Sequence, residues 1–114
     1  MAAYTVQTVV TAGAVPTYAA VSASDTFTPT SNQPHILHVK NAGGSPDSVV
    51  IDDPNSVNPG SATQFDPDVT VSVANASEKM IRIDPLRFKN TGTGVITITH
   101  SFTTSVTAAV FVMP

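Results

Sequence analysis

Charge is scarce in this sequence: charged residues make up 11% of its 114 residues, against about 25% in an ordinary globular domain. Cysteine is absent, which excludes a disulfide framework and thiolate metal sites. Five Lys and Arg residues and a net charge of −3 argue against nucleic-acid binding, which usually needs a basic patch. No apolar run is long enough to span a bilayer, so we expect no membrane partner.

Hydroxyl side chains are abundant where charges are missing: Ser and Thr account for 27 residues, 16 Thr and 11 Ser. A lone small domain normally covers itself with Lys, Glu, Arg and Asp. We therefore expect a subunit that packs against other subunits. The first residues, 1–5, lack the basic and apolar regions of a signal peptide, so we expect use without Sec export.

Short alternations of apolar and polar residues, separated by Pro and Gly, predict an all-β fold. In the clearest of them, Val69–Ala74, the three valines point one way, and Thr70 and Ser72 point the other. The predicted strands are 4–11, 24–28, 35–41, 48–51, 69–74, 78–83, 95–102 and 106–113, with one helical turn or corner at 84–88. About seven or eight strands in one domain, 1–114, predict a single β-sandwich or barrel, jelly-roll-like in arrangement.

The last predicted strand, 106–113, is apolar on both faces. One face carries Val106, Ala108, Val110 and Val112, and the other carries Ala109, Phe111 and Met113. A strand buried on one side alternates with polar residues. This strand is therefore predicted to be central in a packed sheet or covered by a neighbouring chain.

Catalytic and metal-binding patterns are missing. His35, His38 and His100 are the candidate bases, but no serine stands in a Gly-x-Ser-x-Gly elbow, so we expect neither an enzyme nor a catalytic residue. We interpret these histidines as surface or half-buried strand residues. His35 and His38 point to opposite faces of one strand, which argues against a shared metal ion. We expect no metal and no cofactor.

A long acidic loop is predicted at 52–68. Its carboxylates lack the spacing of an EF-hand loop. We interpret them as solvated turn residues, with Ca²⁺ binding as the alternative.

Arginine and large apolar or aromatic side chains are the best candidates for contacts with another protein, because Arg and aromatic residues are enriched at interface cores. The interface candidates are Tyr4, Tyr18, Phe65, Arg87, Phe88, Val110, Phe111 and Met113. Each aromatic candidate is equally a candidate for the core, since aromatic residues are only 6% of the chain.

Several strand and turn segments occur together in a familiar order: DTF at 25–27, LHVKNAGG at 37–44, DVTVSV at 68–73, EKMI at 78–81 and SVTAAV at 105–110. In this order they resemble small β-rich virion proteins of tailed bacteriophages that act as capsid decoration, or cement, proteins. The resemblance covers nearly the whole chain, but the 52–68 loop and the stretch 81–84 depart from it. It implies a non-enzymatic homo-oligomer, assembled in the host cytoplasm, that clamps the phage major capsid protein on the capsid exterior.

Two alternatives stay open. A tail-tube or head–tail connector subunit forms rings by itself, whereas a cement protein needs the shell. A host-receptor or carbohydrate-binding module on a similar sandwich usually exposes several aromatic rings, and this chain has no Trp, two Tyr and five Phe.

Overall fold

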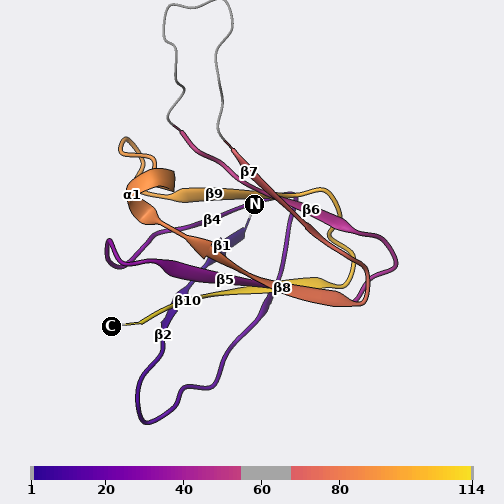
Figure 1. Cartoon of the computed structure of the whole chain (residues 1–114), viewed down its shortest axis with the longest axis horizontal. Helices are drawn as coiled ribbons and strands as arrows, with labels where there is room; N and C mark the ends of the chain where they lie inside the picture. The colour runs from indigo at the N-terminus through magenta and orange to yellow at the C-terminus, as the bar shows by residue number, and fades with distance from the viewer. Residues whose placement is uncertain (1, 55–67, 114) are drawn as a thin grey trace, which may run out of the picture.

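The computed structural model describes residues 2–54 and 68–113. In these ranges the chain forms two five-stranded sheets packed against each other, with one short helix (Figure 1). The predicted all-β sandwich is thereby confirmed, and the barrel alternative is not formed, because the two sheets stay separate. The part of the acidic loop at 55–67, with Phe65, lies outside the described residues.

Sheet A contains the strands β1 (Ala2–Tyr4), β4 (Ser24–Phe27), β9 (Ile96–His100), β6 (Asp47–Ile51) and β7 (Val69–Val73), in that spatial order. Neighbours are antiparallel except β1, which pairs in parallel with β4. The strands β1 and β7 therefore form the two edges of this sheet.

Sheet B contains β2 (Val6–Thr8), β10 (Val106–Val112), β5 (His35–Asn41) and β8 (Ser77–Ile83). β2 runs parallel to the second half of β10, and the two-residue strand β3 (Ala19–Ala20) runs antiparallel to its first half. The helix α1 (Pro85–Phe88) follows β8, as the predicted helical turn.

The core lies between the two sheets, where alternate residues of each strand point inward. Leu37 and Val39 from β5 meet Val49 from β6 and Ile96 and Ile98 from β9 in this layer, and all five are fully buried. β10 is central, between β5 on one side and β2 with β3 on the other. The first of the two predictions for this strand is therefore confirmed.

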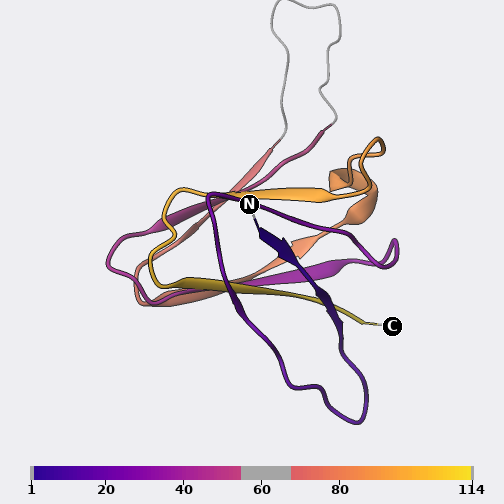
Figure 2. The ribbon, with the colours of Figure 1, turned by 180° about the vertical axis from the view of Figure 1, so that it is seen from behind.

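The predicted first strand, 4–11, is wrong in its bounds. The chain begins pairing at Ala2, changes sheets around Thr5 and stops pairing at Thr8, which gives β1 and β2 instead of one strand. Figure 2 shows this N-terminal segment, followed by the long loop of residues 9–18. One extended segment can serve two sheets because it lies along the open side of the sandwich, which local alternation does not reveal.

Candidate functional site

The outward-facing residues of sheet B form a continuous surface across four strands. Strand pairing arranges them in rows that run across the sheet. The first row holds Gln7, Phe111, Ile36 and Arg82, the second Ala109, His38 and Met80, and the third Thr107, Lys40 and Glu78. Apolar and aromatic side chains make up most of the first two rows. Gln7 and Arg82 lie at the two ends of the first row, and Lys40 and Glu78 place charge in the third.

Tyr18, at the end of the 9–18 loop, lies on this surface. Its ring meets the rings of Phe111 and His38 edge to face, with centroids 6.2 and 5.4 Å apart. Its hydroxyl is 2.7 Å from Nδ1 of His38, whose Nε2 is 3.0 Å from Oε1 of Glu78. Because a carboxylate only accepts, Nε2 donates to Glu78, and the second ring nitrogen, Nδ1, shares a hydrogen bond with the tyrosine hydroxyl. The Lys40 Nζ stands 4.1 Å from the Tyr18 ring centroid.

Exposed apolar side chains lie beside Tyr18 and beside the neighbouring Ile36. Met80 and Met113 are 69% and 63% exposed, and Val9 and Val10 are 41% and 45% exposed. Two hollows, of about 320 and 440 Å³, meet at Ile36 and are lined by these residues together with Phe111, Pro34 and Arg82. We call the three rows, with Tyr18, Val9, Val10 and Met113, the sheet B face. An exposed apolar patch rimmed by polar residues is typical of a contact surface for another molecule.

Three of the eight predicted interface candidates, Tyr18, Phe111 and Met113, come together on the sheet B face. Sequence reasoning did not pick out the residues that join them, Met80 and Ile36. The alternation of 78–83 was a usable signal, since it places Met80 and Arg82 opposite the inward Ile81 and Ile83.

The other candidates do not join that surface. Tyr4, Phe88 and Val110 are buried in the chain's own core, so their side chains are not available to a partner in this structure. Arg87 lies on α1, where its Nε is 3.0 Å from Oδ2 of Asp53 and its guanidinium covers the Phe88 ring at 4.6 Å. Phe65 lies outside the described residues.

Sheet A contains a buried polar cluster that sequence reasoning missed. Four neighbouring strands, β1, β4, β9 and β6, contribute Tyr4, Asp25, His100 and Asp47. His100 Nδ1 lies 2.7 Å from Oδ2 of Asp47, and its Nε2 lies 3.7 Å from Oδ2 of Asp25 and 3.4 Å from the Tyr4 hydroxyl. The Tyr4 hydroxyl donates to Asp25. Both carboxylates are fully buried.

Backbone groups complete this cluster. Asp25 accepts hydrogen bonds from the Ser22 N–H, at 3.1 and 3.2 Å, and from the Ser22 hydroxyl. Asp47 Oδ1 accepts from the N–H groups of Ser101 and Phe102, at 3.0 and 3.2 Å. Burial and the hydrogen bond to Asp25 raise the pKa of Tyr4 well above its usual range, so the phenol stays protonated. Every member has a partner, which is typical of a structural network.

The interpretation of the histidines as surface or half-buried residues is wrong. His35, His38 and His100 are all buried, and each of their ring nitrogens lies within hydrogen-bonding distance of a partner. For His35 these are the Gln33 carbonyl and the Thr30 N–H. Within 2–54 and 68–113, no group of three or more ligating side chains is arranged to hold a metal ion.

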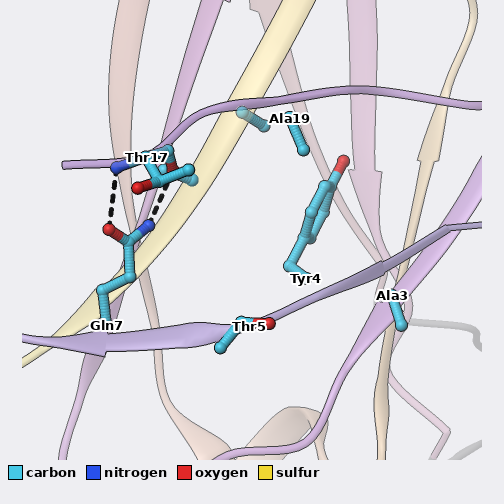
Figure 3. Close-up of a pocket in the computed structure, with 8 residues that line it drawn as sticks. Ala3, Tyr4, Thr5, Gln7, Thr17 and Ala19 are labelled. Atoms are coloured by element: carbon cyan, nitrogen blue, oxygen red, sulfur yellow. Dashed lines mark hydrogen bonds between the residues drawn. The ribbon is translucent and has the colours of Figure 1, made fainter.

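A hollow of about 330 Å³ lies beside Tyr4, between the N-terminal segment and the strands β3 and β10 (Figure 3). Small side chains line most of it, chiefly Ala3, Ala19, Ala108 and Ala109. At one end the Gln7 amide binds both backbone groups of Thr17, with Nε2 donating to the carbonyl at 2.7 Å and Oε1 accepting from the N–H at 2.8 Å. This pair of bonds fixes the 9–18 loop against β2, next to Tyr18.

No protein-family model, curated protein or solved structure matches this chain. In the described ranges, no helical segment has the length and apolar character that crossing a membrane requires. Its function is therefore inferred from its own residues and surfaces.

Proposed function

We propose that this chain is a structural virion protein: a capsid decoration, or cement, subunit that binds the phage major capsid protein on the outside of the head shell and stabilises it without catalysis or a cofactor. The sheet B face is the observation that carries the proposal. It presents exposed apolar side chains beside aromatic rings: Met80 lines one hollow with Tyr18 and Phe111, and Met113 lines the adjoining hollow with Ile36. An apolar centre with charged residues at the rim is the usual anatomy of a protein interface.

The scarcity of charge supports the same proposal. A subunit that packs into seams of a shell must remove water from its contact surface, and desolvating unpaired ions is unfavourable. The outer face of sheet A meets this requirement, because the residues that form it on β4, β9, β6 and β7 are uncharged. They are Ser24, Thr26, Thr97, Thr99, Ser48, Val50, Thr70 and Ser72. Many copies of a modest interface, each burying about 1,000 Å², then stabilise the shell through avidity.

Aromatic exposure favours this role over a carbohydrate-binding or host-receptor module. Of the aromatic side chains within 2–54 and 68–113, three are buried and three are half-buried. A sugar platform needs open ring faces for stacking. A tail-tube or connector subunit is the second alternative, and ring formation by the isolated chain distinguishes it.

Co-sedimentation with phage capsids tests the proposal. We expect saturable binding to decoration-stripped shells, with an increase in the melting temperature of the shell. The double variant M80K/M113K should weaken this binding at least about tenfold, because it places two charges in the apolar patch.

The matched control is L86K, since Leu86 is 75% exposed but lies on α1, away from the sheet B face. Thermal melting of each variant without capsids tests whether its fold is intact. Rings formed without shells support the connector alternative, and retention on glycan beads supports the receptor module. Either result, without shell binding, contradicts the cement role.

A further inference from the structure

The two sheets have four edges, and three of them are protected against pairing with another chain. β1 and β2 are only three residues long. β8 is seven residues long but carries Glu78, Lys79 and Arg82. Short length and charged side chains, Lys above all, are the usual means by which proteins prevent an edge strand from accepting a further strand.

The fourth edge, β7, has neither protection. Its five residues, Val69–Val73, are uncharged and contain no proline, and in the described structure the strand pairs with β6 alone. The nearest preceding charge is turned back into its own chain, since Asp68 Oδ1 accepts the Asp53 N–H at 2.8 Å. An uncharged edge of this length is a template for strand addition.

We propose that β7 pairs antiparallel with β7 of a second copy of this chain, about a two-fold axis at Val71. The strand reads Val-Thr-Val-Ser-Val, which is nearly the same in both directions. In this register Val69 faces Val73 of the other copy and Thr70 faces Ser72 of the other copy. Identical surfaces on both partners are what a two-fold interface requires.

The register also preserves both faces of sheet A. Val73 belongs to the core, and Val69 and Val71 pack against it. The pairing therefore continues the apolar layer from one copy into the next. Thr70 and Ser72 are exposed on the outer face, beside Val50 and Ser48 of β6. Two five-stranded sheets thereby join into one, with an uncharged, mostly hydroxyl outer face. This pairing supplies the homo-oligomer expected of a capsid decoration protein, and to that extent it rests on the proposed function.

Charge substitutions at the two exposed positions test the pairing and its register. T70K/S72K places lysine opposite lysine at two points across the axis, whereas T70K/S72E places lysine opposite glutamate at both. Both substituted side chains are exposed, so the fold is retained. T91K/T93K adds the same charge at two exposed positions of the turn before β9 and serves as the matched control.

Sedimentation velocity of the full chain, from about 1 μM to 1 mM, provides the readout. We expect the wild type, T91K/T93K and T70K/S72E to form dimers, and the dissociation constant of T70K/S72K to rise at least tenfold. A wild type that stays monomeric overturns the proposal, as does equal association of T70K/S72K and T91K/T93K, or a T70K/S72E variant as weak as T70K/S72K. Dimers that ignore capsids contradict the cement role alone, and shell binding by a monomer contradicts the pairing alone.

Discussion

At the scale of single residues, the buried cluster of Tyr4, Asp25, His100 and Asp47 is held by hydrogen bonds on several sides. A carboxylate without water is tolerated only when hydrogen bonds and nearby positive or donating groups replace its hydration. Asp25 and Asp47 each have two or more such donors, with His100 between them. Removal of one donor therefore leaves a buried charge partly unsatisfied.

Tyr4→Phe removes the hydroxyl that donates to Asp25. We expect the variant to lose about 1–3 kcal/mol of unfolding free energy at pH 8. The pKa of Tyr4 is raised in the folded state, so above roughly pH 10 the unfolded chain releases this proton while the folded chain keeps it. The unfolded state then binds fewer protons, and the stability that Tyr4 contributes decreases as the pH rises.

Urea unfolding of both proteins at pH 8 and pH 11 checks this prediction. The difference in unfolding free energy between wild type and Tyr4→Phe should be largest at pH 8 and smaller at pH 11. Tyr18 is present in both proteins and cancels from the comparison. A difference that stays constant or grows with pH contradicts the role assigned to the Tyr4 hydroxyl.

At the scale of elements, β10 connects the core to the sheet B face. Val110 points inward, is fully buried and pairs in register with Leu37 of β5. Its neighbour Phe111 points outward, is half-buried and packs against Tyr18. The proposed function therefore assigns separate tasks to these adjacent residues, one in folding and one in shell binding.

Substitution of each residue by Asp should separate these tasks. Val110→Asp places an unpaired carboxylate in the core, which costs several kcal/mol, and we expect it to abolish folding. Phe111→Asp should keep the fold, with a lower melting temperature, and lose shell binding because Tyr18 loses its support. Circular dichroism melting and capsid co-sedimentation measure the two effects. Wild-type melting of Val110→Asp, or wild-type shell binding by Phe111→Asp, contradicts this division.

At the scale of the whole molecule, the N-terminal segment holds the two sheets together. β1 extends sheet A beside β4, and β2 extends sheet B beside β10. Tyr4 from this segment enters the polar cluster, and Gln7 binds the 9–18 loop at Thr17. One short segment thus contributes to both sheets and to the position of Tyr18.

Removal of residues 1–8 should lower the melting temperature more than Tyr4→Phe does. The truncation removes an edge strand from each sheet as well as the hydrogen bond of the Tyr4 hydroxyl. The truncated chain should also aggregate at concentrations where the full chain does not, since β4 and β10 then expose unpaired backbone groups. Thermal melting and light scattering measure these effects, with Tyr4→Phe as the reference. A truncated chain that melts with or above Tyr4→Phe contradicts the proposed role of the segment.

Local patterns in the sequence predicted the all-β class, most strands, the helical turn at α1 and the central position of β10 as one of two possibilities. These predictions succeeded because side-chain alternation is a property of single strands. The same alternation put Tyr18, Phe111 and Met113 among the contact candidates without showing that they meet. Alternation did not distinguish Tyr4, which lies in the core, from Tyr18, which lies on the surface.

The sequence by itself determined the scarcity of charge, the abundance of hydroxyl groups and the alternation of apolar and polar residues that makes this chain a β protein. Only the tertiary structure decided which strands are neighbours. That order places Asp47 beside His100, 53 positions later in the chain, and leaves β7 as an edge. The physical reason is that strand order depends on how both sheets bury their apolar faces together, and no single segment of the chain contains that information.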